Sequence, residues 1–226
     1  EENPFLGVRA IRLSLRRKDL FLTQLRAILR GGSDYNFKIM FPMVTGIDEV
    51  RQAKELLAEA HEELTREGKE HRWPISTGIM VETPAAAVLS PILAKEVDFF
   101  SIGTNDLTQY TMAAERGNPA LSELSDALNP AVLRLIRMVV EAAHAKDKWV
   151  GVCGELAGEA LAIPVLVGLG VDELSMNPGS IPQAKAIVRE MTLSGAEEVA
   201  REVLQADSSE EVREIAGKYL EALEIR

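Results

Sequence analysis

The sequence predicts an α/β protein whose strands run parallel. Short apolar runs alternate with longer segments whose apolar residues recur at helical spacing, and this unit occurs five times along the chain. The runs are mostly continuous in apolar residues, which is typical of strands buried on both faces. Hydrophobic residues make up 46% and charged residues 27% of the 226 residues. That is the composition of a folded protein and excludes a disordered chain.

Five apolar runs carry the expected strands. Turn residues bound each run: Pro42 stops the first, and glycine or polar residues follow the others. We expect strands over residues 37–41, 75–82, 97–102, 149–153 and 172–176.

Helical patterns follow the runs. Pro84 and Pro130 predict helix starts, because proline fits the first turn of a helix. A turn is expected at 103–106, and Pro164 is expected to kink or interrupt its helix. Ser209 is the expected N-cap of the last helix. The expected helices are 48–67, one starting at Thr83, one running through Leu107 to Met112, 130–146, 156–169, 182–193, 196–205 and 209–223.

Repeated strand–helix units imply crossover connections between parallel strands. Two architectures fit them: an open doubly wound sheet and a piece of a (β/α)8 barrel. No G-x-G-x-x-G fingerprint follows a strand, which disfavours a dinucleotide-binding domain. In either architecture ligands bind at the carboxyl ends of the strands, so functional side chains are expected there.

Composition excludes several classes of function. The 25 Lys and Arg against 35 Asp and Glu give a net charge of −10, which argues against nonspecific nucleic-acid binding, since that needs a basic face. No apolar run reaches the ~18 residues of a membrane span, and the first residues do not resemble a signal peptide. The one cysteine, Cys153, excludes an internal disulfide and fits a reducing cytoplasm.

Polar residues recur where neighbouring strands end. Glu82 ends the second expected strand, Asn105 and Asp106 follow the third, and Cys153 ends the fourth. Two carboxylates from adjacent strand ends suit Mg²⁺, which takes one or two protein carboxylates together with substrate phosphate oxygens. The alternative is that Glu82 and Asp106 only cap the helices that follow them.

Arg9 and Arg116 are the candidate phosphate-binding residues, since a guanidinium presents its donors in a fixed fork. Arg116 lies in a short segment after Asp106, whereas spacing alone gives Arg9 the weaker claim. Asn105 could donate to a phosphate oxygen or make a turn with its own backbone. The arginines that lie in a helical pattern and are more typical of a solvated face are Arg16, Arg17, Arg26 and Arg30.

Cys153 ends a strand between glycines, which is an exposed position for a thiol. It could transfer a proton there, although most single cysteines are small buried hydrophobes. His61, His71 and His144 lack supporting context and are expected to be surface or packing residues. No Ser-His-Asp arrangement, P-loop or zinc spacing is present.

Five longer motifs occur in order: N-P-F-L-G-V-R at 3–9, I-M-F-P-M at 39–43, G-I-M-V-E-T-P-A-A at 78–86, D-F-F-S-I-G-T-N-D-L-T-Q-Y at 98–110 and G-V-C-G-E-L-A-G at 151–158. Together they resemble the C-terminal phosphoenolpyruvate-binding domain of Enzyme I of the bacterial sugar phosphotransferase system. The resemblance covers essentially the whole chain, residues 1–226.

The resemblance implies a fold and a reaction. Members of this family transfer the phosphoryl group of phosphoenolpyruvate to a histidine, pass it to the phosphocarrier HPr, and release pyruvate. By motif match, Glu82 and Asp106 would hold Mg²⁺, and Cys153 would protonate the enolate carbon. The residues that would bind the substrate are Arg9, Asn105, Asp106 and Arg116.

The chain also departs from the family's pattern. The family domain is a full (β/α)8 barrel, and only about the last five units are expected here. We expect this chain to lack the leading strands and the N-terminal domain that carries the phosphorylated histidine, and therefore not to complete a turnover alone. Exposed strand edges favour association, and the family dimerises through this domain, so a homodimer is expected. The alternatives are a domain of a pyruvate phosphate dikinase or phosphoenolpyruvate synthase, and a non-catalytic dimerisation or sensing module.

Overall fold

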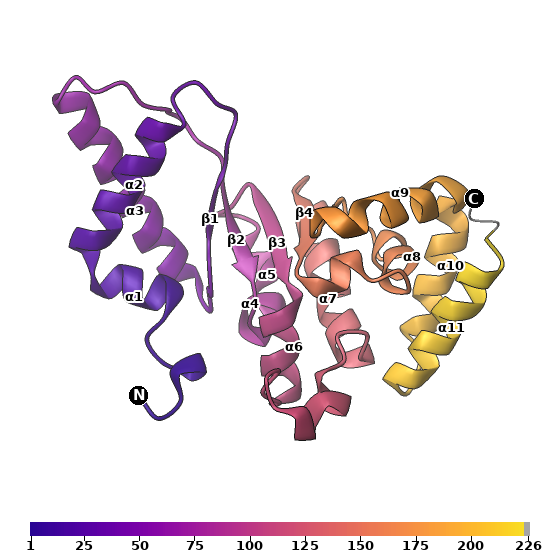
Figure 1. The fold of residues 1–226 in the computed structure, drawn as a ribbon. Coiled ribbons are helices and arrows are strands. Elements are labelled where there is room, and N and C mark those ends of the chain that lie inside the picture. Colours follow the sequence, from indigo (N-terminus) through magenta and orange to yellow (C-terminus); the bar gives the residue numbers. More distant parts are fainter. Residues whose placement is uncertain (224–226) are drawn as a thin grey trace.

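A single parallel sheet organises the molecule (Figure 1). The structure, a computed structural model, describes residues 1–223. Each strand pairs in parallel with the strand that precedes it, so the order in the sheet is the order in the sequence. The strands are β1 (Ile39–Phe41), β2 (Thr77–Val81), β3 (Phe99–Gly103), β4 (Trp149–Cys153) and β5 (Glu173–Ser175).

The strand order decides between the two expected architectures. A doubly wound sheet reverses its direction of growth at a switch point, where it places its ligand. Here every new strand is added to the same edge, as in a (β/α)8 barrel. The prediction of a partial barrel is therefore confirmed, and the doubly wound alternative is wrong.

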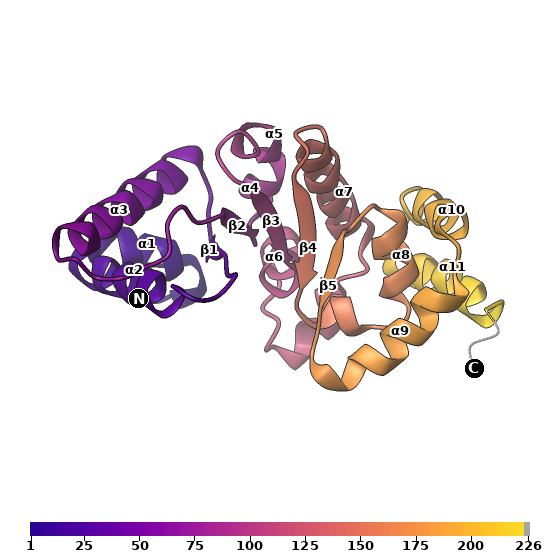
Figure 2. The same ribbon diagram turned by 90° about the horizontal axis from the view of Figure 1, so that it is seen from above.

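The two faces of the sheet differ in polarity. On the face toward the helices, the side chains of β2, β3 and β4 are apolar and fully buried, as Ile79, Ile102 and Val150 illustrate. On the other face the alternate residues include Ser101 and Cys153, and both are only partly buried. Figure 2 shows α4, α5 and α7 gathered beside the middle strands. The polar face of the sheet is thus the inner face of the partial barrel.

Eleven α-helices surround the sheet among residues 1–223. The longest, α3, buries one stripe of apolar residues, and α7 starts at Pro130, with the Asn129 side chain accepting a hydrogen bond from Ala131 N. No helix in this part of the chain is long and apolar enough to cross a membrane. The helices are α1 (Ala10–Arg16), α2 (Lys18–Gly31), α3 (Ile47–Arg66), α4 (Pro84–Val88), α5 (Ser90–Leu93), α6 (Thr104–Met112), α7 (Pro130–His144), α8 (Ala162–Gly168), α9 (Ile181–Glu190), α10 (Leu193–Val203) and α11 (Ser209–Glu221).

Four short segments of 3₁₀ helix complete the description of residues 1–223. They occur in connections, where short 3₁₀ pieces are common. One of them lies in the connection between α6 and α7, and another lies in the connection that follows β4. They are η1 (Pro4–Leu6), η2 (Pro119–Ser125), η3 (Glu155–Gly158) and η4 (Pro178–Ser180).

Three sequence predictions are wrong in detail. No separate turn exists at 103–106, because α6 begins at Thr104 directly after β3. Its first turn contains Asp106, where an acidic side chain interacts favourably with the helix dipole. The N-cap of α11 is Ser208, whose hydroxyl accepts from Glu211 N, rather than Ser209.

The third error concerns Pro164. The expected helix over 156–169 is split, but the break between η3 and α8 comes before the proline. Pro164 is the third residue of α8, where a backbone N–H would have no partner within the helix, so its ring is tolerated without a kink.

The tightest contact between helices joins α8 to α10. A Cβ built on Gly168 would lie 1.9 Å from the carbonyl oxygen of Ala196, so only glycine lets the two backbones approach this closely. Replacing it should push α10 away from the core. We expect Gly168→Ala to lower the free energy of unfolding by about 1–3 kcal/mol in urea denaturation.

Gly217 provides the matched control, because it lies inside α11 and an added methyl group would meet nothing closer than 3.9 Å. Gly217→Ala should stabilise the chain by about 0.5–1 kcal/mol, since alanine costs less backbone entropy in a helix. Equal stability of Gly168→Ala and the unmodified chain would contradict this view of the α8–α10 contact.

Candidate functional site

A cavity of about 160 Å³ lies at the carboxyl ends of β2, β3 and β4. The strands are in register, with Val81 opposite Ile102 and Gly103 opposite Cys153, so the residues that follow them meet in space. Five of the six residues singled out from the sequence line this cavity, and Arg9 reaches one of them through an ion pair. The lining residues are Met80, Glu82, Gly103, Asn105, Asp106, Arg116, Cys153 and Gly154.

Glu82 follows β2 and is 8% exposed. Its Oε2 accepts a hydrogen bond of 2.7 Å from the backbone N–H of Met43, in the loop after β1. Burial raises the pKa of Glu82, and the nearby carboxyl of Asp106 raises it further. Glycine at 103 is required beside it, because a Cβ there would lie 2.7 Å from Glu82 Cγ.

Asp106 lies in the first turn of α6 and is 7% exposed. Its Oδ2 lies 3.4 Å from Nη2 of Arg9. Its Oδ1 is buried, and no hydrogen-bond donor in residues 1–223 reaches it. A buried oxygen without a partner is uncommon in folded proteins and calls for a ligand.

The alternative that these acids only cap helices fails for both. The hydroxyl of Thr83 caps α4, accepting from Ala86 N, while Glu82 bonds to a different loop. Asp106 lies inside α6, and its free oxygen bonds no backbone N–H. Two buried carboxylates from adjacent strand ends, one with an unpartnered oxygen, fit Mg²⁺, a hard cation that prefers oxygen ligands.

The two predicted arginines differ in their contacts. Arg9 is held by Asp106 and by the hydroxyl of Tyr110 at 3.3 Å, and its guanidinium lies 5.6 Å from the centre of the Phe5 ring. Arg116 is exposed, and its side chain makes no ion pair within the described part of the chain. Its backbone N–H is held by the side chain of Gln109. Arg116 is thus a cation available to a ligand.

Cys153 differs from the exposed thiol expected from the sequence. It is partly buried, with Sγ accepting from the Ser101 hydroxyl at 3.4 Å and lying 3.5 Å from the carbonyl oxygen of Ile102. Burial is the main reason that its pKa is raised, and the charge of Glu82 adds to the effect. At neutral pH the thiol therefore keeps its proton, as a proton donor must.

The loop after Cys153 depends on a special backbone. Gly154 has a φ of +109°, which disfavours any residue with a Cβ. A Cβ there would also lie 2.7 Å from the Thr104 hydroxyl and 2.9 Å from Asn105 Oδ1. Asn105 Oδ1 accepts from Glu155 N at 3.2 Å, so the amide –NH₂ of Asn105 remains available to donate to a ligand.

The remaining sequence candidates lie away from the cavity. His61 and His71 contact each other through Nδ1 and Nε2 at 2.7 Å, and His144 pairs with Asp172, so all three are surface or packing residues as expected. Arg26 is an exception to the solvated face expected for its helix, because it bridges Glu63 of α3 and Glu67, the residue that follows α3.

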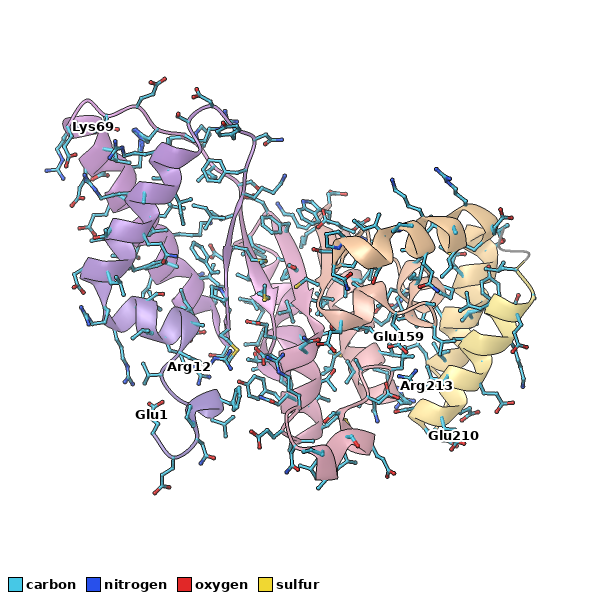
Figure 3. All side chains as sticks on the ribbon, in the orientation of Figure 1. Glu1, Arg12, Lys69, Glu159, Glu210 and Arg213 are labelled. Atoms are coloured by element: carbon cyan, nitrogen blue, oxygen red, sulfur yellow. The ribbon has the colours of Figure 1, made fainter. Side chains whose placement is uncertain are left out.

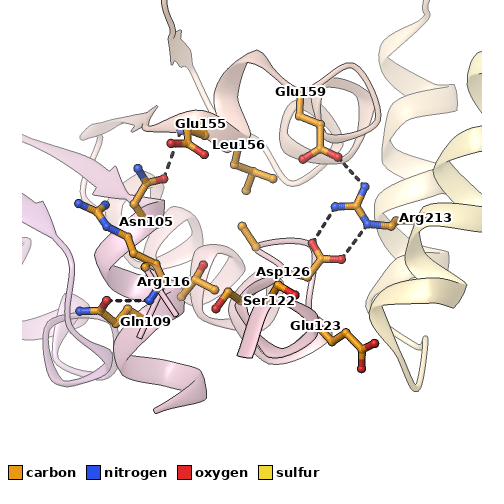
Figure 4. A pocket seen from close by; sticks show the side chains of 14 residues that line it. Asn105, Gln109, Arg116, Ser122, Glu123, Asp126, Glu155, Leu156, Glu159 and Arg213 are labelled. Atoms are coloured by element: carbon orange, nitrogen blue, oxygen red, sulfur yellow. Dashed lines mark hydrogen bonds and ion pairs between the residues drawn. The ribbon is translucent and has the colours of Figure 1, made fainter. Parts of the chain in front are cut away.

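Sequence reasoning missed a second, larger cavity of about 720 Å³ that shares Asn105 and Arg116 with the first. Figure 4 shows these two residues on one side of it, and Arg213 with its carboxylate partners on the other. Arg213 lies 87 and 54 residues from those partners in the sequence, so no local spacing could have indicated the contact.

The chain matches a described protein family over residues 1–193: PEP-utilising enzyme, PEP-binding domain. It is 52% identical over 214 residues to the phosphoenolpyruvate-protein phosphotransferase of Priestia megaterium, covering 95% of this chain and 37% of that protein. It is 51% identical over 212 residues to the Bacillus subtilis (strain 168) protein of the same name, covering 94% of this chain and 37% of that protein. The chain therefore spans little more than a third of the length of these relatives.

The fold is also similar to that of solved structures. A citrate lyase from Burkholderia xenovorans LB400 superposes with a TM-score of 0.55 at 17% sequence identity, covering 88% of this chain and 67% of that chain. At this identity the likeness concerns the fold alone.

The raised pKa of Glu82 makes stability depend on pH. Since the folded state binds this proton more tightly than the unfolded state, the stability it contributes is complete below the ordinary value of 4.5 and is lost as pH rises through the raised value. In metal-free buffer we expect Glu82→Gln to melt a few degrees higher than the unmodified chain at pH 7, roughly 2–4 °C per kcal/mol gained. The difference should shrink below pH 4.5.

The control is Glu59→Gln, which removes an exposed glutamate from the surface of α3. Its melting temperature should follow that of the unmodified chain at every pH. Identical pH profiles for Glu82→Gln and the unmodified chain would show that Glu82 titrates normally.

Proposed function

The chain belongs to the family of PEP-utilising enzymes, PEP-binding domain, and from that premise we propose that it binds phosphoenolpyruvate in the strand-end cavity as part of a phosphoenolpyruvate-protein phosphotransferase. The observation that carries the proposal is the unpartnered, buried Oδ1 of Asp106 beside Glu82, in a cavity that also holds a cation and a protonated thiol. Phosphoenolpyruvate needs each of these groups.

The substrate carries a phosphate and a carboxylate. Arg116 is exposed at the mouth of the cavity and can form a forked contact with either anionic group. The free amide –NH₂ of Asn105 is a second donor beside it. Arg9 contacts Asp106, a residue of the cavity, and Asp106 and Tyr110 orient its guanidinium.

Glu82 and Asp106 would hold Mg²⁺. When bound, the cation would neutralise charge on the phosphate oxygens as the phosphoryl group leaves. Glu82 has a second task, because its negative charge adds to the effect of burial, which is the main cause of the raised pKa of the Cys153 thiol.

Proton transfer completes the conversion to pyruvate. Breaking the bond between phosphorus and the enol oxygen leaves an enolate, whose methylene carbon must accept a proton. We assign that proton to Cys153 Sγ, since burial raises its pKa and it lies in the same cavity as Arg116. The thiolate that remains recovers a proton from solvent, so the residue is unchanged after each reaction.

The phosphoryl acceptor is a histidine outside this chain in our proposal. None of His61, His71 and His144 lines the cavity. We propose a phosphohistidine domain, the carrier HPr and a second copy of the chain as its partners, and the cytoplasm as its compartment. The shared name of the relatives favours this function over a dikinase or a synthase.

Isothermal calorimetry tests the proposal directly. Phosphoenolpyruvate titrated into the folded chain should bind with Mg²⁺ present and bind at least about tenfold more weakly without it, the equivalent of ~1.4 kcal/mol. Equal heats with and without Mg²⁺ would remove the metal from the proposal, and the absence of binding in both titrations would refute the site.

Substitutions in the cavity should separate binding from proton transfer. Asn105→Ala and Arg116→Ala should each weaken phosphoenolpyruvate binding by about tenfold or more, because each removes a donor to a charged ligand. Cys153→Ser should bind normally, since the thiol acts only after the phosphoryl group leaves. Arg51→Ala, which removes an arginine paired with Glu96 on the surface, is the control and should not change affinity. Normal binding by Arg116→Ala would refute its role.

A further inference from the structure

One arginine outside the candidate site forms ion pairs with both of the loops that border the site. Arg213 lies on α11, beyond the residues 1–193 that match the family. Its Nε and Nη2 donate to the two carboxylate oxygens of Asp126 over 2.7 and 2.9 Å. Its Nη1 donates to Glu159 Oε1 over 2.6 Å (Figure 4). We call these three side chains the Arg213 clamp.

The two carboxylates belong to different loops. Asp126 follows η2 in the connection between α6 and α7, residues 113–129, which also carries Arg116. Glu159 follows η3 in the connection from β4 to α8, which begins directly after Cys153. Figure 3 shows Arg213 and Glu159 facing each other between α11 and the rest of the molecule. The clamp therefore joins the loop of Arg116 to the loop of Cys153.

The inner ends of both loops are held by α6. Gln109 Oε1 accepts from Arg116 N at 3.1 Å, and Asn105 Oδ1 accepts from Glu155 N at 3.2 Å. The other ends of the loops, at Asp126 and Glu159, are held by the Arg213 clamp. Because the Arg116 side chain has no ion pair within residues 1–223, its direction depends on how the loop beneath it is held.

The Arg213 clamp contains more charge-assisted hydrogen bonds than an ordinary surface ion pair. Exposed single pairs contribute little to stability. Here one guanidinium makes three charge-assisted bonds, two of them as a fork with one carboxylate, and the Asp126 side chain is only 16% exposed. The bond to Asp126 is also the main reason that the pKa of Arg213 is raised.

We propose that Arg213 is a positioning residue, which holds the loops of Arg116 and Cys153 in the arrangement that forms the substrate cavity. Its effect on ligand binding rests on the proposed function, whereas its effect on the two loops does not. The C-terminal helix α11 thereby becomes part of the site's construction, although it contributes no group to the cavity.

Two residues of this chain allow the opening of the loops to be measured without any ligand. Arg116 is the only lysine or arginine between Lys95 and Arg134, so trypsin cleavage at Arg116–Gly117 reports opening of its loop. Cys153 is the only cysteine, so its rate of alkylation by iodoacetamide reports access to the thiol. Both rates are measured on the folded 226-residue chain.

Arg213→Leu should raise the cleavage rate at Arg116 by about tenfold, the alkylation rate of Cys153 by about threefold, and the dissociation constant for phosphoenolpyruvate with Mg²⁺ by about tenfold. Arg213→Lys keeps the charge but loses the fork, so its two rates and its affinity should lie between those of Arg213→Leu and the unmodified chain. Such intermediate values would show that the effects of Arg213→Leu do not come from misfolding.

The matched control is Arg26→Leu, which breaks a second bridge from an arginine to two carboxylates, from α2 to Glu63 and Glu67 in and just after α3. It should leave both rates and the affinity unchanged. Equal effects from Arg26→Leu would mean general destabilisation and overturn the proposal.

Unchanged cleavage and alkylation in Arg213→Leu would also overturn it, as would faster rates with unaltered phosphoenolpyruvate affinity. If the unmodified chain binds no phosphoenolpyruvate, the proposed function fails separately, and the two rates alone decide whether Arg213 positions the loops.

Discussion

Two carboxylates, Glu82 and Asp106, lie buried in one small cavity, and in the described part of the chain only one of their four oxygens takes part in an ion pair. Arg9 pairs with one oxygen of Asp106 at 3.4 Å, while the other oxygen has no partner among the described residues. Glu82 has a single backbone donor and a raised pKa. Burying like charges together costs free energy unless a cation joins them. The arrangement is therefore unfavourable for the isolated chain and favourable for a chain that binds a metal and an anionic substrate.

The strand order creates this arrangement. Because each strand is added beside the one before it, Glu82, Asp106 and Cys153 follow three neighbouring strand ends and converge without long loops. The apolar residues of the same strands face the helices and form the core. Alternation along a strand thus separates the stabilising side chains from the functional ones. Gly103 and Gly154 allow the close approach of backbone and side chains that the cavity requires.

Much of this could be predicted from the sequence, because the signals are local. The run 149–153 has the bounds of β4, and Pro130 starts α7 as expected. The start of α6 was missed because Gly103 resembles a turn signal although the helix follows it directly. The burial of Cys153 depends on Ser101 from the neighbouring strand, and the role of Arg213 depends on partners 54 and 87 residues away. Contacts of this kind have no signature in one sequence.

The central claim is that the strand ends form one metal-dependent site for phosphoenolpyruvate. A crystal structure of the chain grown with Mn²⁺ and phosphoenolpyruvate would test it most directly, because the anomalous signal of manganese locates the cation. The account predicts a peak bound by Glu82 and Asp106, with the substrate's anionic groups against Arg116 and its methylene carbon facing Cys153 Sγ. A manganese peak elsewhere, or substrate density away from these side chains, would contradict it.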